Sequence, residues 1–139
     1  MTLHVLLDSN IVVDFLLLRP GFADNAEEIF RQIKAGAFVG CISSSAITDV
    51  YYIIETKTPS GYAWEMMEYL YRALRILPVI RETVRDALDS KMDDFEDAVQ
   101  AAAAKNCGID TIVTRDKAGF ANSDLRVFSP EEFLATVPL

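Results

Sequence analysis

The chain has 139 residues, of which 51% are hydrophobic and 24% are charged. This length predicts a single domain over residues 1–139, with a core large enough to need no metal or disulfide support. The formal net charge of −8, from 13 basic and 21 acidic residues, argues against a surface that grips a polyanion by counterion release. A nucleic-acid function would therefore need a local basic rim or a partner protein.

Several classes of function are excluded by what the sequence lacks. No uninterrupted apolar run approaches the roughly 20 residues of a membrane span, and no signal peptide pattern opens the chain, so we expect a cytoplasmic protein. Cys41 and Cys107 have no neighbouring Cys or His partner and are expected to be small buried side chains. The only histidine, His4, lies in the first expected strand, which excludes sites that need several histidines. Any chemistry must come from carboxylates.

Short apolar strands alternate with helical patterns through the first half of the chain. An apolar run over 5–7 predicts a buried strand, and Ser9 to Leu17 predicts a helix that Arg19-Pro20-Gly21 ends. Asp24 or Asn25 would cap a second helix that stops at Ala35-Gly36. A strand is expected at 38–42, followed by a helix that begins at the serines 43–45 and ends at 58–61.

The second half repeats the alternation. Helices are expected at 62–74, 82–91 and 98–105, and from Ser129-Pro130 onward; strands are expected at 76–79, 111–114 and 126–128. Pro78 restricts its strand to an edge or a strand end. The stripe of Trp64, Met67, Leu70, Tyr71 and Leu74 is expected to be core or a dimer face. The alternation predicts an α/β fold, a mostly parallel sheet with helices on both faces.

Two of the expected strands have an aspartate at or just after their carboxyl ends. Asp8 follows the first strand, and Asp116 follows the strand at 111–114. Parallel sheets bind their ligands at the carboxyl ends of their strands, so both side chains would face one crevice. Two other interpretations stay open here: Asp8 or Ser9 could cap the following helix, and Asp116 could form a turn.

Two helices carry acids that could reach the same crevice. Asp97 shares a helix face with Asp94, and the alanines that follow would let this helix approach the sheet closely. Either Asp93 or Asp94 could instead cap the helix. Asp49 stands among apolar neighbours and is expected to be partly buried with a partner. The remaining aspartates that we considered are expected to be solvated or in turns: Asp14, Asp24, Asp86, Asp89, Asp110 and Asp124.

Clustered carboxylates repel one another unless they share protons or hold a cation. Two unit charges 4 Å apart cost about 4 kcal/mol at an effective dielectric constant of 20. Hard oxygen ligands suit Mg²⁺ or Mn²⁺, which also bind substrate phosphates and activate water for phosphodiester hydrolysis. A site built from carboxylates alone can bind such an ion, so the scarcity of histidine does not argue against it.

Four segments together resemble the motifs of PIN-domain nucleases, in particular the VapC-like toxin ribonucleases of bacterial toxin-antitoxin systems. They are Leu7-Asp8-Ser9-Asn10, the segment 42–52 around Asp49, Asp94-Phe95-Glu96-Asp97-Ala98, and Ile112-Val113-Thr114-Arg115-Asp116 with Phe120. Each segment alone is weak evidence for the family, but the four occur in the right order over nearly the whole chain. The resemblance implies a small three-layer α/β/α sandwich that often dimerises.

The resemblance also implies roles for individual residues. Asp8, Asp49, Asp97 and Asp116 would be catalytic and would ligate Mg²⁺ or Mn²⁺, with Asp94 as an accessory ligand or cap. Asn10, Thr114 and Arg115 would contact substrate or order the metal ligands. Asp49 stands where many relatives have glutamate, so its contact with metal would run through water. Arg19, Arg115 and Lys117 flank the proposed crevice.

The implied function is a metal-dependent endoribonuclease, the toxin of a toxin-antitoxin pair, with RNA as substrate and an antitoxin protein as partner. One alternative is a stand-alone nuclease of the same fold that acts on other RNA or on structured DNA. A second is a partner-binding module without turnover, which four intact acids argue against. Phosphotransfer folds fit less well, because Asn10 replaces a second aspartate and Asp49 is not at a strand end.

Overall fold

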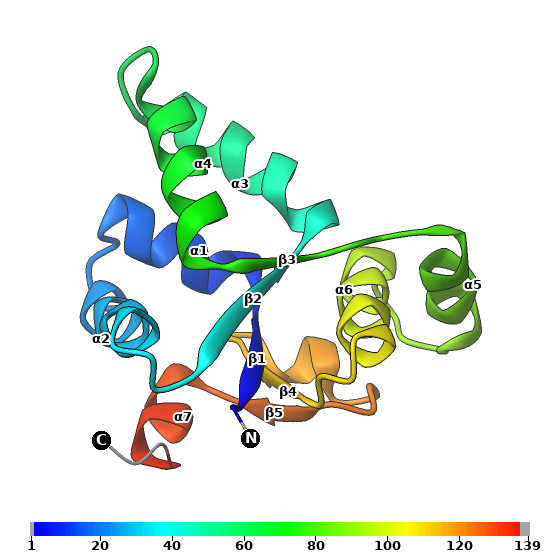
Figure 1. Ribbon diagram of the computed structural model, residues 1–139. Coiled ribbons are helices and arrows are strands. Elements are labelled where there is room, and N and C mark those ends of the chain that lie inside the picture. Colours follow the sequence, from blue (N-terminus) through cyan, green and yellow to red (C-terminus); the bar gives the residue numbers. More distant parts are fainter. Residues whose placement is uncertain (1, 137–139) are drawn as a thin grey trace.

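A five-stranded, fully parallel sheet forms the centre of the computed structural model, which describes residues 2–136 (Figure 1). The strand order is β3-β2-β1-β4-β5, so the first strand lies in the middle and β3 and β5 form the edges. The strands are β1 (His4–Leu7), β2 (Val39–Ser43), β3 (Arg75–Leu77), β4 (Thr111–Val113) and β5 (Arg126–Phe128). Since all strands run the same way, their carboxyl ends meet at one edge of the sheet.

Helices connect the strands and cover both faces of the sheet. They are α1 (Ser9–Leu17), α2 (Ala23–Lys34), α3 (Ser44–Lys57), α4 (Tyr62–Ala73), α5 (Arg81–Asp89), α6 (Phe95–Asn106), the short 3₁₀ helix η1 (Lys117–Phe120) and α7 (Pro130–Thr136). In Figure 1, α1 to α4 lie to one side of the sheet and α5 and α6 to the other. The predicted three-layer α/β/α sandwich with a parallel sheet is confirmed.

The central strand is buried on both faces, as a continuous apolar run requires. Val5 and Leu7 pack into one cluster with helices α1 to α4, whereas Leu6 packs into a second cluster on the opposite face. In that second cluster Ala103 and Ala104 of α6 are fully buried beside Ile112 of β4. Their small side chains let α6 lie close to the sheet, which brings the beginning of α6 toward the strand ends.

Several details differ from the sequence predictions. Helix α2 begins after Phe22, which has no side-chain cap, so the expected cap by Asp24 or Asn25 is wrong. The 3₁₀ helix η1 was not predicted. Leu70 is fully buried, but Trp64 of the same expected stripe is 74% exposed. Cys41 is buried as predicted, whereas Cys107 is only partly buried.

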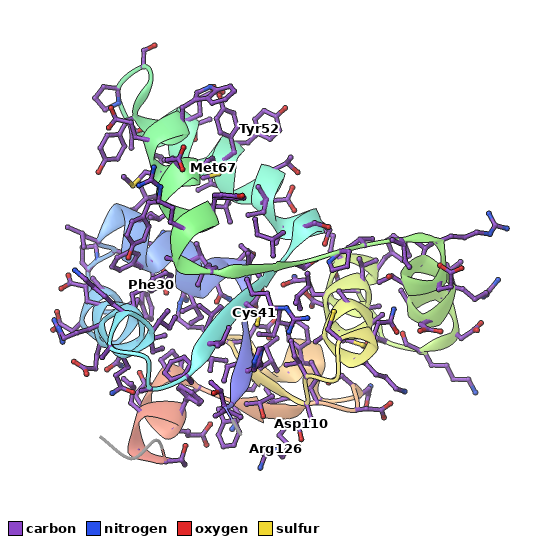
Figure 2. The ribbon with its side chains drawn as sticks, viewed as in Figure 1. Phe30, Cys41, Tyr52, Met67, Asp110 and Arg126 are labelled. Carbon is purple, nitrogen blue, oxygen red and sulfur yellow. The ribbon has the colours of Figure 1, made fainter. Side chains whose placement is uncertain are left out.

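The protruding pair α3 and α4 carries exposed aromatic side chains, with Tyr52 on its outer side (Figure 2). Pro78 follows β3 directly, in agreement with the expected edge strand. Within residues 2–136, no helix combines the length and apolar composition that crossing a bilayer would require.

Candidate active site

Asp8 is the buried acid at the centre of the strand-end edge. It directly follows β1, and its backbone N–H donates to the carbonyl of Val113 at the end of β4. The side chain is 6% exposed, and its Oδ1 accepts the N–H of Ser9 at 2.7 Å as the N-cap of α1. The capping interpretation is therefore correct. Capping uses only Oδ1, so Oδ2 is left for other contacts.

Thr114 connects the two strand-end acids. Its hydroxyl donates to Asp8 Oδ2 at 2.7 Å and accepts the backbone N–H of Asp116 at 2.9 Å. Thr114 is fully buried, so neither hydrogen bond competes freely with water. The hydroxyl thus orients Asp8 and also fixes the backbone from which the Asp116 side chain projects.

The carboxylates of Asp116 and Asp97 both lie next to Gly119 of η1. A Cβ atom on Gly119 would lie 2.7 Å from Asp116 Oδ2 and 2.9 Å from Asp97 Oδ2. Any larger residue would therefore push into both carboxylates. Asp116 also caps η1 by accepting the N–H of Gly119 at 3.2 Å, so this short helix positions the carboxylate.

Asp97 projects from the first turn of α6, and its backbone N–H donates to Asp94 Oδ1 at 2.9 Å. Asp94 is thereby the N-cap of α6, which decides between Asp93 and Asp94. Partial burial, together with repulsion from the charges of Asp94, Asp8 and Asp116, raises the pKa of Asp97 to about 7.

The pKa of Asp8 is also raised, chiefly because burial disfavours its charged form. Hydrogen bonds from Thr114, Ser9 and Gln100 oppose this increase, and the charge of Asp116 adds to it. Asp8, Asp97 and Asp116 therefore form one repelling group of carboxylates. The fold thus brings three of the four predicted acids together.

Asp49 lies at the side of this group rather than inside it. It is exposed on α3, so the expectation of partial burial is wrong. Helices α3 and α6 contact one another, and the Asp49 carboxyl raises the pKa of Glu96 through a hydrogen bond and through its charge. Asp49 thus reaches the crevice beside Glu96, an acid that sequence reasoning did not select although it directly precedes Asp97.

Two buried amide oxygens near Asp8 have no hydrogen-bond partner. They are Oδ1 of Asn10 and Oε1 of Gln100. The Asn10 amide nitrogen donates to Asp8 Oδ2 at 3.2 Å, so Asn10 contacts one of the predicted acids. Gln100 was missed; the available signal was a polar side chain three residues after Asp97, on the same helix face, among alanines.

Asp14 is the clearest correction among the remaining aspartates. It was expected to be solvated, yet it is 1% exposed. Its carboxylate accepts Arg115 Nε at 2.7 Å and Arg115 Nη2 at 3.1 Å, and Arg19 Nη1 lies 3.5 Å away. No local pattern marked this burial, because the partner that permits it, Arg115, lies 101 residues away in the sequence.

The chemistry of the crevice residues suits a hard divalent cation. Within residues 2–136, no group of three His, Cys, Asp or Glu side chains is already arranged to hold a metal ion. The group nevertheless offers carboxylate oxygens from Asp8, Asp97 and Asp116 whose mutual repulsion a cation would relieve. The unpartnered amide oxygens of Asn10 and Gln100 are further oxygen acceptors at the same place. The residues present therefore fit Mg²⁺ or Mn²⁺.

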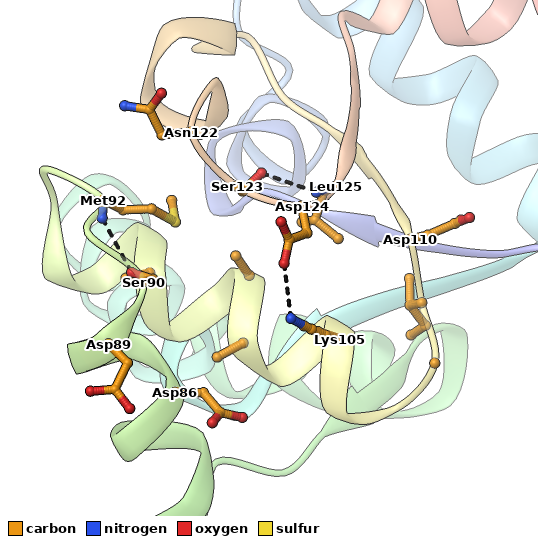
Figure 3. Close-up of a pocket in the computed structure, with 15 residues that line it drawn as sticks. Asp86, Asp89, Ser90, Met92, Lys105, Asp110, Asn122, Ser123, Asp124 and Leu125 are labelled. Carbon is orange, nitrogen blue, oxygen red and sulfur yellow. Dashed lines mark hydrogen bonds and ion pairs between the residues drawn. The ribbon is translucent and has the colours of Figure 1, made fainter.

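A cavity of about 720 Å³ lies elsewhere, along the face of α6 formed by Ala98, Ala101, Ala102 and Lys105. Figure 3 shows Lys105 paired with Asp124 across it, with Asp86 and Asp89 of α5 at its rim. None of the four predicted catalytic acids lines this cavity. We therefore place the candidate active site at the strand ends and not in this cavity.

Comparison with known proteins agrees with this geometry. A PIN domain family model matches residues 4–118, a range that contains β1 to β4 and all four predicted acids. The chain belongs to the PIN-domain family. The strand-end acids are therefore interpreted as residues of a PIN domain.

Individual relatives are similar over nearly their full length. Ribonuclease VapC1 of Aquifex aeolicus is 30% identical over 134 residues, which cover 93% of this chain and 92% of that protein. The DNA-bound VapBC structure from Salmonella typhimurium matches with a TM-score of 0.71 at 16% identity, covering 93% of this chain and 99% of the other. FitAcB from Neisseria gonorrhoeae matches with a TM-score of 0.69 at 20% identity, covering 91% and 98%. The two structures show that the fold is shared.

Proposed function

We propose that this PIN-domain protein is a metal-dependent endoribonuclease that hydrolyses RNA phosphodiester bonds, and that it is the toxin of a toxin-antitoxin pair. The observation that carries the proposal is the convergence of Asp8, Asp97 and Asp116 at the carboxyl ends of parallel strands. Similarity to Ribonuclease VapC1 over almost the whole chain supports RNA as the substrate.

Asp8, Asp97 and Asp116 would hold Mg²⁺ or Mn²⁺, with Asp94 as an accessory ligand and Asp49 acting from the side of the crevice. When bound, such an ion activates a water molecule and neutralises the charge that develops in phosphodiester displacement. The three carboxylates come from β1, α6 and the segment after β4, so the packing of α6 on the sheet sets their spacing.

The neutral polar residues would keep this arrangement in place. Thr114 holds Asp8 Oδ2 and the backbone of Asp116 at once, and Asn10 donates to the same oxygen of Asp8. The predicted substrate contact of Arg115 would lie next to Asp116, on the side of the crevice toward α1. Preorganised side chains of this kind lower the cost of assembling the reactive geometry.

The proposed partners follow from the relatives. Structures named for the complexes VapBC and FitAcB share this fold, which supports a cognate antitoxin for this chain. A homodimer remains a prediction; exposed Trp64 and Tyr71 on α4 would be candidates for its contact surface. A cytoplasmic location is part of the same proposal, since cellular RNA would be the substrate.

The proposal is tested by measuring cleavage of total RNA and of defined RNAs by the purified protein in Mg²⁺. Wild type should cleave, and Asp8→Asn and Asp97→Asn should each lower the rate by at least about a hundredfold. Asparagine is also a good N-cap, so Asp8→Asn should keep α1 intact. Asp86→Asn, an exposed acid on α5, is the matched control and should cleave like wild type.

Circular dichroism and thermal melting would show that each variant is folded. Wild-type activity that survives in both site variants would contradict the proposed centre. A folded wild-type protein that binds a co-expressed antitoxin but cleaves no RNA in Mg²⁺ or Mn²⁺ would instead support the partner-binding module.

A further inference from the structure

A buried ionic cluster joins α1 to the segment after β4. Asp14 of α1 accepts two hydrogen bonds from the Arg115 guanidinium, at 2.7 and 3.1 Å, in the bidentate geometry that fixes an arginine most firmly. The Arg115 guanidinium carbon also lies 3.8 Å from the centre of the Phe22 ring. Arg115 is therefore held from two sides before any ligand arrives.

The cluster contains one more cation than the buried carboxylate can neutralise. Arg19 shares Asp14 with Arg115, its Nη1 lying 3.5 Å from the carboxylate. Among the ion pairs formed by residues 2–136, Asp14 is the only acid that serves two basic side chains. Lys117, the other basic residue near the crevice, is matched by Glu132 at 2.8 Å. A local charge of +1 thus remains beside the acidic crevice.

Both arginines keep donors available to a ligand. In the described part of the chain, Arg115 Nη1 and Arg19 Nε and Nη2 donate to no protein acceptor. The side chains of Arg115 and Arg19 remain 28% and 33% exposed. A planar guanidinium with free N–H groups binds the oxygens of a phosphate well.

The cluster lies close to the acids that the proposed function uses. Arg115 stands between Thr114 and Asp116 in the sequence, and Asp14 lies on the helix that Asp8 caps. Six residues along an α-helix correspond to about 9 Å, so the arginines flank the crevice rather than enter it. An RNA strand in the crevice meets repelling carboxylates there and needs positive charge next to it.

We infer that Arg19 and Arg115, oriented by the carboxylate of Asp14, form a binding site for a non-scissile phosphate of the RNA strand. The inference rests on the proposed function, and it names the basic residues that let a chain of net charge −8 hold a polyanion. In this arrangement Asp14 is a positioning residue, and the two arginines contact the substrate.

Equilibrium binding of a fluorescently labelled single-stranded RNA in Mg²⁺ tests the inference, with Asp97→Asn in every protein to prevent cleavage. The informative change is Arg19→Ala, because Arg115 alone still satisfies Asp14 and the fold should remain. Affinity should fall about tenfold for the loss of one charged phosphate contact. The slope of log affinity against log KCl concentration should decrease by about 0.7 for single-stranded RNA.

Arg126→Ala is the matched control, since it also removes one positive charge but lies at the opposite end of the strands (Figure 2). The RNA affinity of the Arg126→Ala protein should stay within about twofold of the parent, because dissolved salt screens the charge of Arg126 at that distance from the crevice. Arg19→Lys should retain the salt slope. An Arg19→Ala protein that keeps the affinity and slope of the parent would overturn the inference. Cleavage by the protein without Asp97→Asn decides the proposed function separately.

Discussion

At the scale of single residues, Thr114 connects the two acids that end strands. Its hydroxyl holds Asp8 through one hydrogen bond and the Asp116 backbone through another. The site therefore depends on a neutral residue as much as on its carboxylates. In the sequence, only the family resemblance pointed to Thr114.

Thr114→Val removes this hydroxyl and keeps the shape of the side chain. Asp8 Oδ2 then keeps only the hydrogen bond from Asn10, and the N–H of Asp116 loses its side-chain partner. These losses should lower the free energy of unfolding by about 1–3 kcal/mol. Urea unfolding measures the change, and Thr114→Ser, which keeps the hydroxyl, is the control. Equal stability of the valine variant and wild type would show that these hydrogen bonds contribute nothing.

RNA cleavage gives a second measurement on the same variants. Thr114→Val should also lose cleavage relative to Thr114→Ser, because Asp8 and Asp116 would no longer be oriented together. A valine variant that is destabilised and yet fully active would show that Thr114 supports the fold without positioning the acids.

At the scale of elements, the Asp14 cluster attaches α1 to the segment after β4. These parts of the chain are 101 residues apart in sequence, yet the bidentate pair fixes one against the other. Since Asp8 begins α1 and Asp116 follows Arg115, the cluster also limits how far the two acids can move apart.

Asp14→Asn should therefore be strongly destabilising. It leaves two guanidinium groups without their carboxylate in a partly buried place, which should cost about 3 kcal/mol. Asp89→Asn, which breaks the exposed pair with Arg85, should cost less than about 1 kcal/mol. Chemical denaturation of both variants makes the comparison, and equal losses would contradict a structural role for the buried cluster.

The elements themselves follow largely from local patterns in the sequence. The apolar run 5–7, the breakers at 19–21 and the alanines after Asp97 predicted β1, the end of α1 and the close packing of α6, all of which the structure shows. Local patterns suffice there because short-range periodicity and turn residues determine these features.

Features that depend on distant partners could not be predicted in the same way. Burial of Asp14 requires Arg115, which lies in the segment after β4. The exposure of Asp49 depends on how α3 packs against α6. The cap of α2 failed because helix formation began after Phe22 without a side-chain acceptor. Long-range packing decided the burial of Asp14 and the position of Asp49, whereas the start of α2 is a local detail that cap preferences alone did not predict.

At the scale of the whole molecule, the burial of Asp97 and its repulsion by neighbouring acids should make stability depend on pH. The folded pKa of Asp97 is about 7, above its ordinary value of 3.8. An acid whose pKa rises on folding favours the folded state below its ordinary pKa, and this contribution is lost as the pH rises through the folded pKa. In metal-free protein, stability should therefore decrease between about pH 4 and pH 7 because of this group.

Thermal melting of wild type and Asp97→Asn at pH 5 and pH 8, both in EDTA, isolates this contribution. The variant should gain stability relative to wild type at pH 8, where Asp97 is charged in the wild type. Mg²⁺ should raise the melting temperature of wild type more at pH 8 than at pH 5. A stability difference between the two proteins that does not change with pH would show that folding does not raise the pKa of Asp97.

The central claim is that the strand-end acids form a divalent-metal ribonuclease centre. The most direct measurement is the rate of RNA cleavage by wild-type protein first stripped with EDTA and then supplied with Mg²⁺ or Mn²⁺. The account predicts no cleavage in EDTA and full recovery on adding either ion, with no recovery for Asp97→Asn. Cleavage that continues undiminished in EDTA would contradict it.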